Sequence, residues 1–288
     1  MSKIKQKIEL YRLMEWENLL KRVKVKVKDD WPQENLELKR LIVDRQHKFI
    51  YCPINKNASS SLLKSIATIN FLTEGKQAPQ FSRNTYHIYC LLNYSLANYT
   101  YKEASTILNS DYFKFAIVRN PWARLVSTYA NFFIRLLSSG RVSDLARDTA
   151  KFFYGEQKYL EYEDSITFEQ LVEYVCAVDD RDLDPHCQPQ SLFLGNIKYD
   201  FLGRMENLND DLDFIQKSLN LSFNIPKLNR TNYDDSSQSD ENFSGFSSLQ
   251  LRKIENKIPN YKQFYNSRLI NIVADKYAAD IARFGYEF

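Results

Sequence analysis

Two polar segments of the chain hold side chains that could bind a phosphate or a similar anion. The first, PINKNASSS, spans residues 53–61 and contains Lys56 followed by three serines. The second begins with Arg119 and contains Ser127 eight residues later. Each segment follows an apolar run and leads into a helical pattern. Because a helix N-terminus offers unpaired N–H groups and the positive end of the helix dipole, both junctions are predicted anion sites.

At the first junction, Lys56 is the residue with the clearest chemical use. Its ammonium group can neutralise a phosphate, and it can stabilise negative charge on a bridging oxygen while a group is transferred. This is the chemistry of a P-loop, but the GxxxxGK[ST] pattern is absent because no glycine occurs between residues 1 and 74. A capped surface helix with a solvated lysine is the alternative interpretation.

At the second junction, Arg119 ends a strongly apolar run, so it is expected at the carboxyl edge of a sheet, where open α/β folds bind ligands. A guanidinium fork and a hydroxyl such as that of Ser127 can hold one phosphate together. Asn120 is a good N-cap, and Pro121 suits the first helical position. A capped core helix with an arginine ion pair is the alternative. Arg124 is expected on the surface or behind the site.

The chain alternates strand patterns with helix patterns, which predicts an α/β fold with a central, mainly parallel sheet flanked by helices. Strands are predicted over residues 48–52, 113–118 and 197–203. Helices are predicted over 59–70, from 121 toward 137, over 167–176 and 208–219, and from 267 onward. The helix after Pro121 is expected to bury Leu125, Val126, Tyr129 and Phe132.

Two regions are predicted along the chain: a helical and basic N-terminal extension over residues 1–40, and one domain over 41–288. In the extension, residues 4–22 have helical periodicity, and valine alternates with lysine over residues 23–28. Within the domain, residues 138–165 are expected to form a helical insertion or lid, and the Ser-rich residues 229–248 a mobile loop.

Composition narrows the class of protein. The 288 residues are 44% hydrophobic, which supports a substantial core, and their net charge of +3 is too small to indicate general nucleic-acid binding. A membrane span needs about 20 apolar residues, and no apolar run in the sequence approaches that length. The start of the chain does not resemble a signal peptide. The four cysteines have no CxxC spacing and are interpreted as reduced thiols, which favours a cytoplasmic protein without a zinc site.

The two junctions, in this order, resemble the nucleotide-binding motifs of sulfotransferases. The likeness is closest to the Golgi carbohydrate sulfotransferases (sulfotransferase family 2) and more distant to heparan-sulfate 2-O-sulfotransferase. A third segment, DPHCQPQSLFLGNIKYDFLGRMENL, is similar to a family stretch that starts with His-x-x-Pro and continues through Tyr-Asp-Phe to Gly-x-Met-Glu. The C-terminal FYNSRLINIVADKYAADIARFGY resembles the final helix of that family. The resemblance covers roughly residues 47–288.

The resemblance implies a P-loop-like, three-layer α/β fold and the donor 3′-phosphoadenosine 5′-phosphosulfate (PAPS). It implies in-line transfer of a sulfuryl group, without a metal, to a hydroxyl of a carbohydrate or another hydroxylated acceptor. By position, Lys56 contacts the 5′-phosphosulfate and its bridging oxygen, and Arg119 and Ser127 hold the 3′-phosphate. The cradle around the 5′ end is completed by Asn57, Ala58, Ser59, Ser60 and Ser61.

A general base should deprotonate the acceptor hydroxyl, and histidine suits that role near neutral pH. His87 lies between the two motifs, where related enzymes often place the base, and is the first candidate. His186 opens the His-x-x-Pro segment and is the second, as a base or an acceptor contact. His47 precedes the first predicted strand and is expected to be structural.

The chain also departs from the Golgi enzymes, which carry an N-terminal membrane anchor and often paired cysteines after the His-x-x-Pro segment. Here that stretch is SLFLGNIK, without cysteine. Both departures favour a soluble enzyme of a reducing compartment, such as a bacterial cytoplasm. Two other functions stay open. One is a P-loop-like small-molecule kinase, which needs a metal carboxylate and a glycine-rich cradle. The other is a non-catalytic nucleotide-binding module.

Overall fold

The structure, a computed structural model, describes residues 31–75, 77, 85–222, 233–234, 241–254 and 258–288. The predicted N-terminal helix over 4–22 and the basic stretch over 23–28 lie outside these ranges, as does half of the predicted loop over 229–248. The division into an extension over 1–40 and a domain over 41–288 stays a prediction.

The chain forms two compact units, which are described one after the other. The first unit comprises Met1–Ile54, Ala58–Ile117 and Phe193–Leu228, and the second comprises Asn55–Asn57, Val118–Leu192 and Asn229–Phe288. Both units are therefore discontinuous in sequence. Two of the points at which the chain passes from one unit to the other, after Ile54 and after Ile117, are the junctions that the sequence singles out.

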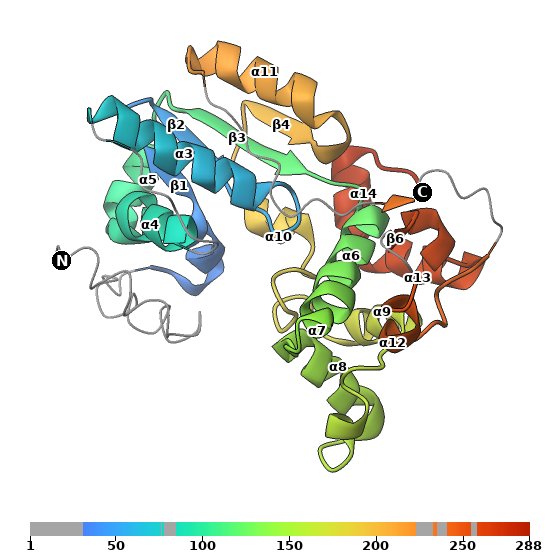
Figure 1. Ribbon diagram of the computed structural model, residues 1–288. Helices are drawn as coiled ribbons and strands as arrows, with labels where there is room; N and C mark the ends of the chain where they lie inside the picture. Colours follow the sequence, from blue (N-terminus) through green and yellow to red (C-terminus); the bar gives the residue numbers. More distant parts are fainter. Residues whose placement is uncertain (1–30, 76, 78–84, 223–232, 235–240, 255–257) are drawn as a thin grey trace. The chain divides into compact units, whose positions relative to one another are not determined.

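The first unit is built on a mixed four-stranded sheet in the order β1-β2-β3-β4 (Figure 1). Its strands are β1 (Ile42–Asp44), β2 (Phe49–Cys52), β3 (Phe113–Val118) and β4 (Phe201–Arg204). β1 pairs antiparallel with β2, and β2 pairs parallel with β3. The predicted α/β class is confirmed, as are the strands at β2 and β3. β1 was not predicted, and the strand expected over 197–203 is shorter and lies later.

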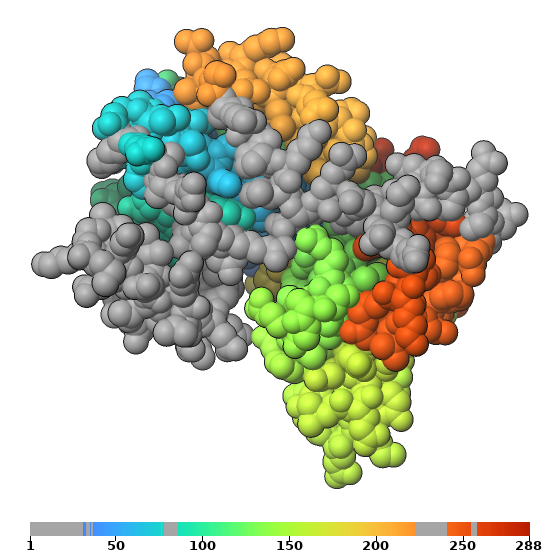
Figure 2. Space-filling model, in the orientation of Figure 1, coloured from blue at the N-terminus to red at the C-terminus, as the bar shows by residue number. Residues whose placement is uncertain are grey.

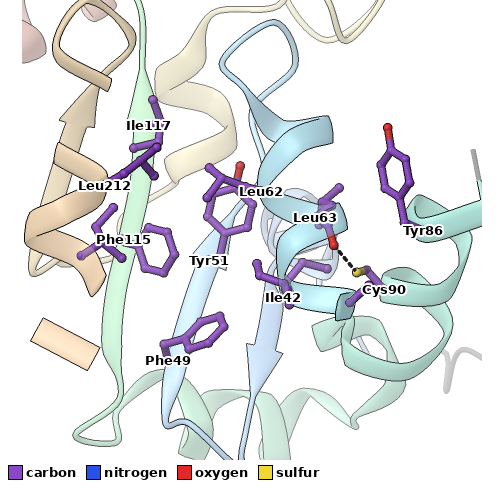
Figure 3. Packing of buried hydrophobic residues seen from close by; sticks show 13 residues of the cluster. Ile42, Phe49, Tyr51, Leu62, Leu63, Tyr86, Cys90, Phe115, Ile117 and Leu212 are labelled. Atoms are coloured by element: carbon purple, nitrogen blue, oxygen red, sulfur yellow. Dashed lines mark hydrogen bonds between the residues drawn. The ribbon is translucent and has the colours of Figure 1, made fainter. Parts of the chain in front are cut away.

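One face of the sheet carries the hydrophobic core of the first unit (Figure 3). Alternation along β2 and β3 puts Tyr51 and Phe115 on this face, where their rings stack with centroids 5.1 Å apart. Leu62 of α3 (Ser59–Thr73) and Leu212 of α11 (Leu208–Leu219) are buried against them. Burial of this apolar face is the main stabilisation of the unit, and the helices predicted over 59–70 and 208–219 are confirmed.

Shorter elements complete the first unit. They are η2 (Gln33–Arg40), α4 (Thr85–Tyr94), η3 (Leu96–Asn98), α5 (Tyr101–Leu108) and η6 (Met205–Asn207). The turn between β1 and β2 is closed by Asp44, which accepts hydrogen bonds from the backbone N–H of His47 at 2.9 Å and from Asn70 at 2.8 Å. The ring Nδ1 of His47 lies 2.9 Å from the same carboxylate, so His47 has the structural role expected of it.

The first helix of the second unit is α6 (Pro121–Tyr129), all of whose residues are buried. Asn120 caps it as predicted, because its side chain accepts a hydrogen bond from the N–H of Ala123. A π-helical turn, η4 (Ala130–Arg135), and α7 (Leu136–Ser138) extend the helix. The predicted burial of Phe132 is wrong. A π turn holds more residues than an α turn, so the fully buried position moves to Phe133, and Phe132 is only half-buried.

The remaining elements of the second unit are mostly helical. They are α8 (Asp144–Tyr154), η5 (Tyr159–Glu161), α9 (Phe168–Ala177), α10 (Gln190–Leu194), β5 (Tyr233–Asp234), α12 (Ser248–Leu251), β6 (Ile258–Pro259), η7 (Tyr261–Phe264), α13 (Ser267–Lys276) and α14 (Ala278–Phe284). α10 continues from this unit into the first. Among the described residues, no helix is both long and apolar enough to cross a membrane.

Three sequence predictions concern these helices. α9 follows its predicted cap Thr167, which forms a capping box with Gln170. The last helix begins at Ser267 as expected but breaks at Tyr277 into α13 and α14. The predicted insertion over 138–165 is helical through α8 and η5. It gives the second unit the yellow-green surface seen in Figure 2. Two of its apolar side chains, Phe152 and Leu160, are exposed.

Candidate functional site

The loop Asn55–Asn57, which leads from β2 toward α3, has an unusual backbone. Lys56 has a φ of 70°, in the left-handed region that residues other than glycine rarely adopt. Its carbonyl accepts a hydrogen bond of 3.1 Å from Nη1 of Arg119. Such a conformation persists only where its surroundings hold it. Arg119 therefore fixes the backbone of the lysine that the sequence predicts at the centre of the site.

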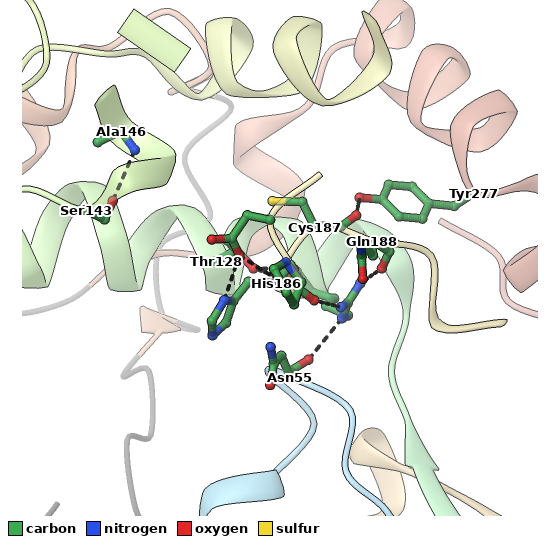
Figure 4. Close-up of polar contacts among 11 residues, drawn as sticks. Asn55, Thr128, Ser143, Ala146, His186, Cys187, Gln188 and Tyr277 are labelled. Carbon is green, nitrogen blue, oxygen red and sulfur yellow. Dashed lines mark hydrogen bonds and ion pairs between the residues drawn. The ribbon is translucent and has the colours of Figure 1, made fainter. Parts of the chain in front are cut away.

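Arg124 holds the same loop from another side. The residue is only 1% exposed, and its guanidinium donates to the carbonyls of Asn55 at 3.1 Å, Gln188 at 2.8 Å and Pro185 at 3.3 Å. Figure 4 shows the contacts of Asn55 and Gln188. A buried charge is tolerated only when it is well hydrogen-bonded. The prediction of a surface position for Arg124 is therefore wrong, whereas a position behind the site fits its contacts.

Gln190 links the loop to the end of β3. Its Oε1 accepts hydrogen bonds from Nδ2 of Asn57 at 2.6 Å and from the backbone N–H of Arg119 at 2.9 Å. Its Nε2 donates to the carbonyl of Arg119 at 2.8 Å. Asn57 and Gln190 are both fully buried. Within the second unit, Lys56, Asn57 and Arg119 are thus brought together.

Positive charge dominates the surroundings of Lys56. Burial, which is the largest cause, and the positive charges of Arg119, Arg135 and Arg124 together lower its pKa to about 7. Desolvation and like charges both disfavour the protonated amine. An anion placed here would relieve this repulsion and favour the charged lysine. The electrostatics therefore fit an anion site better than a solvated surface lysine.

His186 lies in the same electrostatic neighbourhood and is paired with Asp184. One oxygen of Asp184 lies 2.7 Å from the ring Nδ1 and accepts the backbone N–H of His186 at 2.8 Å. The ring of Phe132 packs edge-on against the imidazole, with centroids 4.7 Å apart. When Nδ1–H donates to the carboxylate, the lone pair of the ring is on Nε2. This is the arrangement of a base oriented by an acid.

The pKa of His186 is lowered. Burial is the largest cause, and the charges of Lys56 and Arg124 add to it, while Asp184 acts in the opposite direction. A histidine with a lowered pKa is neutral at pH 7 and can accept a proton there.

The other predicted residues divide between the two units. Ser59, Ser60 and Ser61 form the first turn of α3, and Ala58 precedes them in a left-handed conformation, with no side-chain cap on the helix. In the same unit, the hydroxyl of Ser60 lies 3.1 Å from Nε2 of His87. Ser127 is buried on α6 in the second unit. His87, the first candidate base, thus contacts the serines of α3. His186, the second, is close enough to Lys56 for the charge of the lysine to act on it.

Sequence reasoning missed three members of the site: Asp184, Gln190 and Asp280, whose carboxylate accepts the backbone N–H of Gln190 at 2.7 Å. Gln190 is a neutral side chain in the quoted DPHCQPQ segment and carries no charge signal. Asp280 does have a signal: it lies three residues after Tyr277 and four before Phe284, so an acid occupies the apolar face of the last helix. A buried acid in such a place must have partners.

Comparison with known proteins agrees with this fold. The model of the sulfotransferase family matches residues 39–287, nearly the whole chain. This α/β protein therefore belongs to the sulfotransferase family. No solved structure gives a significant match.

Among curated proteins, the chain is similar to carbohydrate sulfotransferases. It is 27% identical to carbohydrate sulfotransferase 11 of Rattus norvegicus over 203 residues, which are 65% of this chain and 54% of that protein. It is 27% identical to carbohydrate sulfotransferase 14 of Danio rerio over 209 residues, which are 64% of this chain and 49% of that protein. The chain thus spans about half the length of the curated relatives it matches.

The charges around His186 predict opposite responses to two substitutions. We expect the pKa of His186 to lie below 6.5, the ordinary value for histidine. Asp184→Asn should lower it further, because a favourable negative charge is lost, whereas Lys56→Met should raise it. Ring-proton NMR titration measures these values, with His186→Gln to assign the signal. An unchanged or higher pKa in Asp184→Asn would show that the ion pair is absent in solution.

Proposed function

We propose that the protein transfers a sulfuryl group from PAPS to a hydroxyl of a carbohydrate. The carrying observation is the left-handed Lys56, whose pKa is lowered by burial and by three surrounding guanidinium groups. Such a site favours a polyanion, and the family to which the chain belongs uses sulfate donors. The similarity to carbohydrate sulfotransferases supports a sugar as the acceptor.

The residues at the two junctions fit the donor by their chemistry. Lys56 and the backbone from Asn57 to Ser61 provide a cation and helix N–H groups for the 5′-phosphosulfate. The guanidinium of Arg119 and the hydroxyl of Ser127 suit the 3′-phosphate. The donor supplies an activated sulfuryl group on a phosphate leaving group. The expectation that the reaction needs no metal stays a prediction.

In the proposed reaction, a histidine accepts the proton of the acceptor hydroxyl, whose oxygen then forms a bond to sulfur. The bond between sulfur and the bridging oxygen breaks, and that oxygen leaves with the adenosine 3′,5′-bisphosphate. Lys56 stabilises the negative charge that develops on the bridging oxygen. His87, bonded to Ser60, and His186, bonded to Asp184, both remain candidates for the base.

The kinase and binding-module alternatives receive less support. A kinase should prefer ATP with magnesium, and a binding module should bind the bisphosphate without turnover. The family match favours neither alternative over a sulfotransferase. A cytoplasmic location stays a prediction from the cysteine pattern, with which the free thiols of Cys52, Cys90, Cys176 and Cys187 are consistent.

Adenosine 3′,5′-bisphosphate, the product left by the donor, should stabilise the protein selectively. At about a hundred times its Kd it should raise Tm by about 5 °C or more, whereas 5′-AMP and ATP with magnesium should give much smaller shifts. Arg119→Ala should weaken bisphosphate binding about 10- to 100-fold by removing a charged hydrogen bond. Arg141→Ala, on an exposed residue, is the matched control. A larger shift with ATP and magnesium would favour the kinase.

Bisphosphate binding should be coupled to protonation of Lys56. With a pKa of about 7, the free lysine is mostly neutral at pH 8, and a bound anion should raise its pKa and draw in close to one proton. Affinity should therefore fall as pH rises above 7. Calorimetry at pH 8 in two buffers of different ionisation enthalpy measures the uptake. Lys56→Met should abolish it, and Lys158→Met, on an exposed lysine, should not. Equal heats in both buffers would contradict the assignment.

Histidine substitutions should identify the base. Loss of the base should lower turnover about 10²- to 10⁴-fold with bisphosphate affinity little changed. Sulfuryl transfer to a panel of glycans, measured for His87→Ala and His186→Ala, compares the two candidates. His47→Ala is the control, because it should lower Tm but leave turnover of the folded protein intact. Near-normal turnover in both candidate variants would exclude a histidine base.

A further inference from the structure

We propose that Gln190, held in place by Asp280, is a positioning residue. It keeps the two phosphate-binding ends of the donor site at a fixed separation. We call this pair the Gln190–Asp280 brace. The inference rests on the proposed function, since it assigns the brace a role in binding the donor. It concerns two residues to which neither the family match nor the sequence motifs give a role.

The brace touches both ends of the predicted donor site. On one side, Oε1 of Gln190 accepts the 2.6 Å hydrogen bond from Asn57, the neighbour of Lys56. On the other side, the same oxygen accepts the backbone N–H of Arg119, and Nε2 donates to the carbonyl of Arg119. One planar amide therefore joins the loop expected at the 5′ end to the residue expected at the 3′ end.

Asp280 fixes which way this amide faces. Its Oδ2 accepts the backbone N–H of Gln190 at 2.7 Å and lies 3.3 Å from Nε2, while Oδ1 accepts the N–H of Ser191 at 2.7 Å. Only an N–H donor can face a carboxylate, so Nε2 points to Asp280. Oε1 must then face Asn57 and the N–H of Arg119. A flipped amide would leave both of these donors against an NH₂ group.

The brace is also rigid, because it is buried. Gln190, Asp280 and Asn57 are each fully inaccessible to solvent. Hydrogen bonds in such surroundings have no water to replace a lost partner, so their loss is costly and their geometry is well defined. The side-chain amide of Gln190 forms hydrogen bonds with both the N–H and the carbonyl of Arg119. These bonds fix the backbone of Arg119 and so the direction in which its side chain extends.

This geometry predicts a specific consequence for ligands. A ligand with one phosphate needs only one end of the site to be in place. A ligand with phosphates at both ends needs both ends at the correct separation, and benefits from a site in which that separation is already set. The brace should therefore matter more for a 3′,5′-bisphosphate than for a 5′-monophosphate.

Gln190→Glu provides the test, because the substitution is nearly isosteric and its effect depends on pH. The introduced carboxylate would meet the carboxylate of Asp280 and the carbonyl of Arg119 where Nε2 now donates. At low pH the introduced group becomes a neutral acid, which can donate there again while its other oxygen accepts from Asn57. Gln170→Glu is the matched control, since glutamate suits the capping box that Gln170 forms with Thr167.

The measurement is the ratio of the Kd for 5′-AMP to the Kd for adenosine 3′,5′-bisphosphate, at pH 8 and pH 5.5, below the Tm of each variant. The wild type is measured in parallel, because Lys56 and His186 also titrate near this range. At pH 8, this ratio should be about tenfold lower in Gln190→Glu than in the wild type, because the Kd for the bisphosphate rises. The Kd for 5′-AMP should change less than about threefold. At pH 5.5 its ratio should return toward that of the wild type, and Gln170→Glu should match the wild type throughout.

The possible results separate the brace from the proposed function. A wild type without preference for the bisphosphate would overturn both. A normal wild type with an unchanged ratio in Gln190→Glu, or with an equal loss for both ligands at both pH values, would overturn the brace alone, since a purely structural role predicts the latter. If Gln190→Glu does not fold, Gln190→Met replaces it. In that variant the ratio of the two Kd values should be lower than in the wild type at both pH values, and an unchanged ratio would contradict the brace.

Discussion

The guanidinium of Arg124 is buried against backbone carbonyls, and the site of the second unit depends on this interaction. Its three donors reach Asn55 on one side and Pro185 and Gln188 on the other. Each carbonyl must keep its place, because moving it would leave a buried charge without an acceptor. The lysine loop and the His-x-x-Pro segment are therefore held at a fixed separation by one side chain. The contacts of Arg124 therefore set the positions of Lys56 and His186.

The use of carbonyls, rather than carboxylates, as the partners of Arg124 also creates the electrostatic character of the site. Carbonyl acceptors satisfy the hydrogen bonds of a guanidinium but carry only partial charge, so much of the positive field of Arg124 and Arg119 remains. This field lowers the pKa of Lys56 and that of His186. Full neutralisation by nearby carboxylates would have removed the attraction for a phosphate. The residual positive field is what makes the junction suited to an anionic ligand.

The sequence predicted what depends on local pattern and left out what depends on tertiary contacts. The strand at 113–118 and the cap at Asn120 follow from apolar runs and cap chemistry, so they were found. The shift from Phe132 to Phe133 comes from a π turn, which has no sequence rule. The sequence left a surface position open for Arg124 because its partners are carbonyls, and carbonyls are the same in every residue. Gln190 was missed for a similar reason: its role comes from contacts with segments far away in the chain.

The two candidate bases differ in how donor binding would act on them. His186 is held neutral by burial and by nearby cations, and Asp184 is ready to stabilise its protonated form. An anionic donor beside Lys56 would offset those cations and raise the pKa of His186, so the imidazole would become a better proton acceptor once the donor is in place. His87, bonded through Nε2 to Ser60, is linked to the donor through the cradle itself. The charge of the donor would therefore act on the basicity of His186, whereas the contact with Ser60 would act on the position of the His87 ring.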